Sequence, residues 1–411
     1  MKNQDHRRHP GPVRSVFREF FYGFADFRRK LILSVAVGLA AGVVGLAFRF
    51  AVLYAGAIRS AHGWLIWTLP ITGVLIFGLY RLFRYRTEPG VDTIFSSIRS
   101  GSKLRFAQAP LVFAASVLTH LCGGSAGREG AALELGACVG AKIARLLGWG
   151  HKHKRLSILC GMAGAFSGLF GTPLAAFFFV TEITGPAVYH YRGAFFCLIS
   201  ALVAFSLLPI LGCVPPFAAA GTVPVADAAH LFLTLVLTFV CGAVGVFFCA
   251  MMRLIPAFFT RFFPNGYLRG FAGGTLVLLL TQLSGTTRYN GLGRDVILEA
   301  YAGDALIADP IRKTILTGVT LGSGFKGGDL IPALFVGATT GTLAAAWLEL
   351  SGGFGAAIGL ITLFTVVTRC RLAAIFMAFE LFGLETALFA VPVALIAYLF
   401  CGTWSLFRFR R

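Results

Sequence analysis

Apolar segments follow one another along almost the whole chain, and this feature limits the possible folds more than any other. They cover about residues 31–59, 64–84, 108–148, 156–185, 193–214, 228–260, 268–284, 312–349 and 353–407. Several exceed the roughly 20 residues that one bilayer crossing needs, so we expect them to hold more than one helix. Only 13% of the 411 residues are charged, too few to coat a soluble protein of this length. The sequence therefore predicts an all-α, polytopic membrane protein.

The net charge of +19 belongs largely to the ends of the chain and to loops. Residues 1–30 hold eight basic and three acidic side chains, and the last four residues include Arg408, Arg410 and Arg411. Basic residues beside apolar spans are retained on the cytoplasmic side. We therefore expect a multi-pass protein of the cell inner (plasma) membrane with both termini in the cytoplasm. The basic tails would contact anionic membrane lipid rather than nucleic acid.

The sequence offers no convincing metal or cofactor site. Its nine cysteines lie in or beside apolar stretches without metal-ligand spacing, so we expect small buried residues. His151 and His153 lie in a basic loop, which favours a solvated turn over a metal site. The stretch Gly322–Gly327 fits the glycine pattern of dinucleotide-binding loops, but it follows an apolar helix-like span instead of a strand. We expect no cofactor and no bound metal.

The two halves of the chain resemble each other at a nearly constant spacing. Four matches recur in order, 198 to 203 residues apart: Gly42–Gly45 with Gly242–Gly245, Gly90–Ile94 with Gly293–Ile297, Gly136–Gly140 with Gly337–Gly341, and Leu174–Glu182 with Leu372–Glu380. Internal duplication is typical of transporters, whose substrate site lies at mid-membrane between the repeats. We predict a basic N-terminal segment (1–30), a first transmembrane repeat (31–215), a second repeat (216–411) and no soluble C-terminal domain.

One glycine-rich break in the first half has the features of an anion site. Gly127, Arg128, Glu129 and Gly130 precede a helical run that begins at Ala131. Glycines before a helix expose its first N–H groups, and the helix dipole makes that end positive. The Glu129 carboxylate could occupy these amides itself, and its protonation would then free them for a diffusing anion. The alternative is an N-terminal acid that is paired with Arg128.

The equivalent break in the second half repeats this arrangement. Gly328, Asp329, Leu330 and Ile331 lie between a glycine cluster and the next helical run. Glu182 and Glu380 end the paired Leu-Ala-Ala segments. Each is either a carboxylate on a proton path or a charge at a helix end.

These motifs resemble those of the CLC chloride channels and proton-coupled anion antiporters. The run Gly127–Gly130 is similar to the family's G-R-E-G-P signature, and Gly327–Pro332 is similar to its G-G-x-F-x-P loop. The stretch Phe166–Ala175 resembles a third family motif. The resemblance covers about residues 30–407. It implies a homodimer with one anion pathway per subunit, built from inverted repeats of tilted and discontinuous helices.

The resemblance also implies roles for single residues. Glu129 corresponds to the gating glutamate, and the amides of Asp329 and Leu330 would contact the central anion. The family's inner loop aligns with Pro89–Asp92, which includes Gly90 and lacks the family's serine hydroxyl. The late tyrosine corresponds to Phe407. The family's internal proton glutamate falls at Ile183, next to Glu182. These departures are similar to the fluoride-exporting branch, although Ile331 stands where that branch has threonine.

We therefore expect CLC-type transport of chloride or fluoride, coupled to protons, through a mid-membrane site that Glu129 gates. A passive voltage-gated chloride channel is the alternative within the family. The alternatives from other classes are a secondary transporter of a non-halide solute and a membrane-embedded lipid-modifying enzyme. Such an enzyme would need a cluster of His, Asp or Ser at one membrane face, and the sequence has none. We expect no enzymatic activity.

Overall fold

Glycines and prolines divide the long apolar runs into helices. The computed structural model describes residues 12–85, 90–149, 153–185, 193–212, 221–402 and 405–406, with side chains from residue 23 onward. The first half contains α1 (Pro12–Ala61), a 3₁₀ helix η1 (Gly63–Thr68), α2 (Leu69–Leu82), α3 (Val91–Ser100), α4 (Gln108–Leu121), α5 (Glu129–Leu146), α6 (Lys154–Phe170), α7 (Pro173–Ile183), α8 (Ala194–Phe205) and α9 (Leu207–Ile210). The second half contains α10 (Ala228–Phe262), α11 (Gly266–Ser284), α12 (Arg294–Ala302), α13 (Ala308–Gly322), α14 (Leu330–Trp347), α15 (Gly352–Thr368), α16 (Arg371–Phe382) and α17 (Leu384–Leu399).

The expected all-α architecture with interrupted helices is confirmed. The apolar run 108–148 breaks at its glycines into α4 and α5, and the run 312–349 breaks in the same way into α13 and α14. In the described part of the chain, four helical segments are long and apolar enough to cross a membrane, and several shorter apolar helices accompany them. Irregular backbone is tolerated at membrane depth only where protein or a water-filled cavity covers it. The two breaks are therefore the natural places for a buried site.

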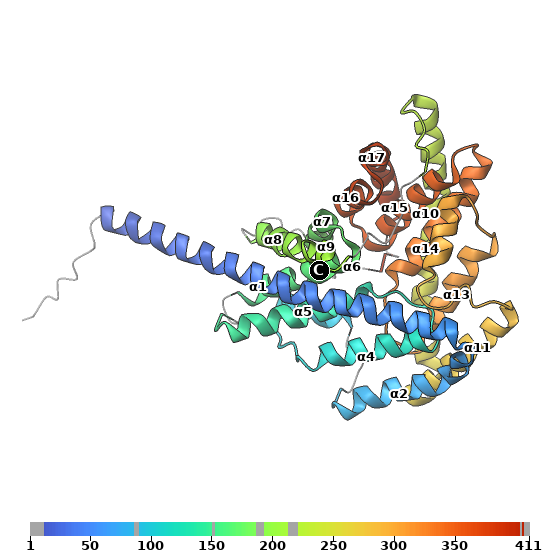
Figure 1. The fold of residues 1–411 in the computed structure, drawn as a ribbon, viewed down its shortest axis with the longest axis horizontal. Coiled ribbons are helices and arrows are strands. Elements are labelled where there is room, and N and C mark those ends of the chain that lie inside the picture. Colours follow the sequence, from blue (N-terminus) through green and yellow to red (C-terminus); the bar gives the residue numbers. More distant parts are fainter. Residues whose placement is uncertain are drawn as a thin grey trace, which may run out of the picture.

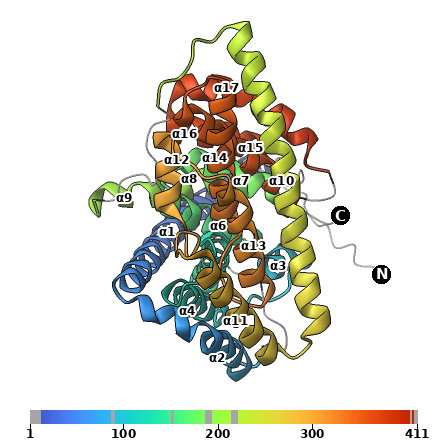
Figure 2. The same cartoon turned by 90° about the vertical axis from the view of Figure 1, so that its right-hand side faces the viewer.

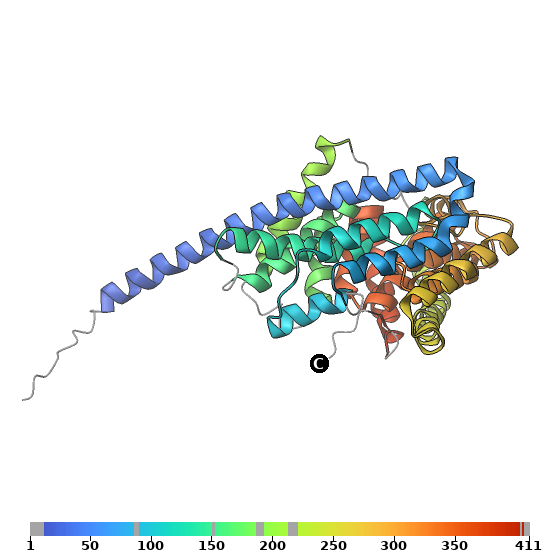
Figure 3. The same cartoon turned by 90° about the horizontal axis from the view of Figure 1, so that it is seen from below.

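The first helix, α1, includes residue 30, where the sequence analysis placed the end of the N-terminal segment. Helix α1 continues through that position without interruption, because no proline and no glycine cluster follows Pro12. Its first turns project from the body of the molecule, and its second half runs along α4 and α5 (Figures 1 and 3). Asp26 and Arg59 of α1 are separated by about 50 Å, because an α-helix rises about 1.5 Å per residue. They mark opposite ends of the molecule.

Equivalent helices of the two halves occupy the centre. α5 packs on α6, α14 packs on α15, and most residues of these helices are buried. Figure 2 shows α14 and α15 among the other helices, while the long α10 runs down one side. The eight described cysteines are free and buried, as expected. The core therefore holds α5 and α14 firmly, and both begin at a glycine-rich break.

Candidate functional site

The two glycine-rich loops meet and exchange backbone hydrogen bonds. The N–H of Gly127 donates to the carbonyl of Gly328 at 2.6 Å, and the N–H of Gly328 donates to the carbonyl of Gly127 at 2.8 Å. A reciprocal pair between equivalent residues is what a local two-fold axis between the repeats produces. The starts of α5 and α14 consequently face the same point.

The Glu129 carboxylate occupies that point. One of its oxygens, Oε2, accepts hydrogen bonds from the N–H groups of Arg128 at 3.1 Å and Ile331 at 3.2 Å. Neither α5 nor α14 has a side-chain cap at its first residue, so their N-terminal amides are open to an acceptor. Glu129 is fully buried, and its charge is stabilised by the positive ends of two helices.

Glycine is required on both sides of this carboxylate. A Cβ atom placed on Gly127 would lie 2.3 Å from Glu129 Oε2, and one on Gly328 would lie 2.8 Å from the same oxygen. Gly130 lies close to the second loop, since a Cβ there would stand 3.4 Å from the carbonyl of Gly327. The backbone therefore closes around the Glu129 carboxylate, and any side chain would displace it.

A buried arginine supplies positive charge beside the carboxylate. Arg128 is 3% exposed, and its Nε and Nη1 atoms have no hydrogen-bond partner among the described residues. Its charge attracts Glu129 and repels Arg49 and Arg294. Burying an arginine without a full set of acceptors is costly, and an anion beside it would reduce that cost.

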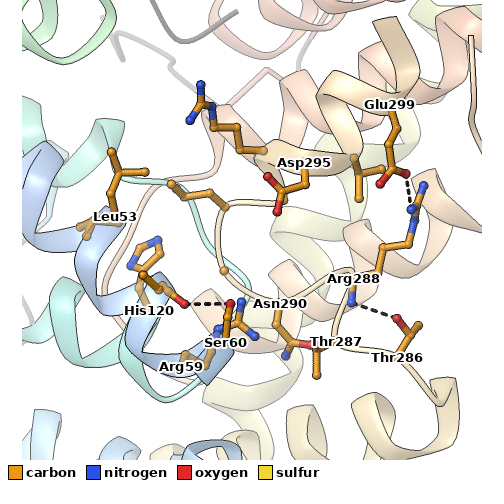
Figure 4. A pocket seen from close by; sticks show the side chains of 18 residues that line it. Leu53, Arg59, Ser60, His120, Thr286, Thr287, Arg288, Asn290, Asp295 and Glu299 are labelled. Atoms are coloured by element: carbon orange, nitrogen blue, oxygen red, sulfur yellow. Dashed lines mark hydrogen bonds and ion pairs between the residues drawn. The ribbon is translucent and has the colours of Figure 1, made fainter. Parts of the chain in front are cut away.

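A cavity of about 550 Å³, which we call the outer cavity, lies at the Arg59 end of α1. Figure 4 shows Arg59 and His120 on one side of it and Asp295 and Glu299 on the other. Arg294 also lines the cavity, and it lies close enough to Arg128 for their charges to interact. The cavity therefore leads from the Arg59 end of α1 toward Arg128.

A buried lysine holds the wall of the outer cavity. Lys313 of α13 is fully buried, and its Nζ donates to the carbonyls of Tyr289 at 3.0 Å and Gly291 at 2.8 Å. Arg288 is fixed nearby through Asp309 and Glu299. These contacts immobilise the segment between α11 and α12 that forms one side of the entrance.

The helix α3 borders the opposite side of Glu129. Gly90 is its N-cap, and Val91 approaches Gly130, where a Cβ would lie 3.8 Å from Val91 Cγ2. This places the predicted inner loop next to the first turn of α5. Asp329, the N-cap of α14, and Leu330 lie directly beside the contact with Ile331. Phe407, the remaining predicted anion contact, lies outside the described residues.

Glu182 of the first repeat caps a helix of the second, and Glu380 of the second repeat caps a helix of the first. The Glu182 carboxylate accepts from the N–H groups of Leu372 at 3.2 Å and Ala373 at 2.9 Å, at the start of α16. The Glu380 carboxylate accepts from Leu174 at 2.7 Å and Ala175 at 2.9 Å, at the start of α7. These bonds assign both carboxylates a structural role in joining the repeats, while the proton role of Glu182 stays a prediction.

We expect Glu182→Gln and Glu380→Gln each to lower stability by about 1–2 kcal/mol, because a charged acceptor at a helix N-terminus is lost. Thermal unfolding in detergent measures this loss. Glu385→Gln, an exposed acid in the first turn of α17, is the matched control. The two capping variants also separate the roles of Glu182. If Glu182→Gln stops proton transport and Glu380→Gln does not, Glu182 has a proton function beyond capping.

Several buried ionisable residues were not predicted from the sequence, and Glu134 and Lys313 are two of them. Glu134 of α5 is 5% exposed and accepts a hydrogen bond from Gln108 Nε2 at 2.8 Å. Both are ionisable residues within apolar helices, and that signal alone could have identified them. Among the described residues no group of three or more His, Cys, Asp or Glu side chains could hold a metal ion.

Comparison with known proteins gives consistent matches. The family model described as voltage gated chloride channel matches residues 73–402. A chloride/fluoride channel protein of Pseudomonas syringae pv. tomato is 30% identical over 388 residues, which cover 93% of this chain and 86% of the relative. An H(+)/Cl(-) exchange transporter ClcA of Vibrio cholerae is 27% identical, with 85% of this chain and 81% of the relative covered. The crystal structure of a CLC-type fluoride/proton antiporter superposes with a TM-score of 0.89 at 29% identity, covering 93% of this chain and 98% of that one.

Proposed function

The chain belongs to the voltage-gated chloride channel family, the CLC family, and we propose that it exchanges fluoride for protons across the membrane. The observation that carries this proposal is the position of the Glu129 carboxylate, which accepts backbone hydrogen bonds at the starts of both α5 and α14. The same amides would hold a halide when the carboxylate leaves. Partial charges from helix ends bind an anion without the full countercharge that would prevent its release.

In this mechanism Glu129 alternates between two states. As a carboxylate it accepts hydrogen bonds from the amides at the starts of α5 and α14 and excludes a free anion. After taking up a proton it loses its charge, its attraction to the helix ends weakens, and a fluoride ion replaces it. Arg128, with two unpartnered nitrogen atoms beside Glu129, would attract the anion from the outer cavity. Proton uptake and anion binding are coupled because the Glu129 carboxylate and the anion compete for one place, and protonation removes the carboxylate.

Fluoride is favoured over chloride by the relatives whose names mention it. The Pseudomonas syringae relative is named a chloride/fluoride channel protein, and the structure with a TM-score of 0.89 is a fluoride/proton antiporter. The inner loop, which we align with Pro89–Asp92, also lacks the family's serine hydroxyl. Chloride exchange is the alternative outcome of the test below.

Liposomes containing the purified protein test this proposal. We expect efflux of loaded fluoride, recorded with a fluoride electrode, together with proton uptake recorded by a pH electrode. Chloride efflux under the same conditions should be slower. Flux of fluoride without proton movement would identify a passive channel, and faster chloride exchange would identify a chloride/proton exchanger. Absence of flux for both anions would refute halide transport.

We also propose a cytoplasmic N-terminus and a homodimer. Arg28, Arg29 and Lys30 lie near the projecting end of α1, and basic residues at a span are retained in the cytoplasm. The outer cavity, at the Arg59 end, would then face outward.

Exposed apolar side chains on α16 and α17, such as Phe379 and Leu384, offer a surface for a second copy or for lipid. Cross-linking in native membranes distinguishes these two.

A further inference from the structure

A second cavity, of about 710 Å³, lies at the end of the molecule opposite to the outer cavity. It is formed by the end of α3 and the loop after it, the last turns of α5 and the start of α6. His153, the N-cap of α6, lies 3.6 Å from Asp26 of α1, which fixes the cavity at the N-terminal end of that helix. We call it the basic cavity. Its basic lining residues are Arg99, Lys103, Arg145, Lys154 and Arg155, and none of the described lining residues is acidic.

Backbone carbonyls are the hydrogen-bond partners of two basic side chains of the basic cavity. Lys154 Nζ donates to the carbonyl of Gly101 at 2.7 Å and to that of Ser102, while Arg145 Nε donates to the carbonyl of Ala141 at 3.1 Å. Within the described part of the chain, Lys103, Arg145 and Lys154 form no ion pair. Arg145 and Lys103 both repel the Lys154 ammonium. Bringing such charges together is unfavourable unless an anion joins them.

The helix dipole explains the positions of only some of the basic residues in this cavity. Arg99 and Arg145 lie in the last turns of α3 and α5, where a basic residue is favoured by the helix dipole. Lys154 and Arg155 instead open α6, where the dipole is positive and a basic residue is unfavourable. The start of α6 has no side-chain cap, so its first N–H groups add to the positive potential.

We propose that the basic cavity binds a phosphate-bearing anion. Its volume is in the range of small-molecule sites and is far larger than a halide needs. Lysine and arginine together are suited to phosphate, which accepts several charge-assisted hydrogen bonds. The anion is either the headgroup of an anionic lipid or a soluble phosphate compound. The exposed Leu146, next to Arg145 on α5, offers an apolar surface for an acyl chain.

The test uses the full-length protein in detergent with two kinds of probe. Thermal unfolding is followed with pyrophosphate and ATP, against sodium chloride of equal ionic strength. Native mass spectrometry measures binding of cardiolipin and phosphatidylglycerol, against phosphatidylcholine. We expect stabilisation or retained binding with at least one source, and a weakening of that binding as salt is raised. A response to the soluble probes alone identifies a phosphate compound, and a response to the anionic lipids alone identifies a headgroup.

The double variant Lys103→Gln/Arg145→Gln is expected to weaken this binding by about tenfold or more, because two charged donors are lost. Arg145→Lys, which keeps the charge, should bind nearly as the parent does. Lys142→Gln, an exposed residue of α5 outside the cavity lining, is the matched control and should have no effect. Equal affinity of the double variant and the parent, or no binding from either source, overturns the proposal. Neither result bears on halide exchange, which the flux assay measures separately.

Discussion

Replacing Glu129 by glutamine is expected to reduce proton transport to the background leak while anion flux continues. Glutamine has nearly the same shape, but it carries no charge and cannot take up or release a proton. Its one carbonyl oxygen could take the place of Oε2 and accept from the N–H groups of Arg128 and Ile331, but without the negative charge that strengthens these bonds. The glutamine side chain would therefore bind these backbone amides more weakly than a carboxylate does, and the amides would be free to bind a halide more often.

The measurement is simultaneous recording of fluoride and pH in liposomes, with the voltage clamped by potassium and an ionophore. Glu385→Gln is the control, because Glu385 is an exposed acid on α17 and should leave both fluxes unchanged. If the Glu129 variant still moved protons in fixed proportion to fluoride, the proton carrier would be another group. The buried Glu134 would then be the first residue to examine.

The sequence predicted the elements of this site well, because they depend on local signals. Glycines followed by an apolar run indicate an exposed helix N-terminus. Helix α5 begins at Glu129, two residues before the predicted Ala131, and α14 begins at Leu330, inside the second predicted break. The repeat could also be predicted, since equivalent segments recur at a nearly constant spacing. Anion binding at helix N-termini follows from the backbone alone and needs no particular side chain.

What the sequence did not provide are the contacts between the halves. Nothing local to Gly127 indicates that it exchanges hydrogen bonds with Gly328, or that Ile331 donates to Glu129. The caps formed by Glu182 and Glu380 have the same origin, because each carboxylate lies at the end of one helix and serves the start of another about 190 or 206 residues away. A long-range partner depends on how helices pack, which periodicity and composition do not specify.

The glycines at the crossings of the central helices lead to the second large expected effect. A Cβ on Gly140 of α5 would lie 2.0 Å from the carbonyl oxygen of Ser157 on α6. A Cβ on Gly341 of α14 would lie 2.0 Å from that of Gly355 on α15. We expect Gly140→Val and Gly341→Val each to lose about 3 kcal/mol of stability or more, because two helix backbones must separate. Thermal unfolding in detergent, followed by size-exclusion chromatography, measures the loss.

The control is Gly78→Ala in α2, where the added methyl group finds its nearest atom at 3.7 Å. That change should be neutral or stabilise the protein by up to about 1 kcal/mol, because alanine is a better helix former. The valine variants should also lose coupled transport, because α6 and α15 pack against α5 and α14, whose N-termini surround the Glu129 carboxylate. If only one of them were damaging, the two halves would not contribute equally to the site. If both variants folded and transported normally, close packing at these glycines would not be required to direct the N-termini of α5 and α14 toward Glu129.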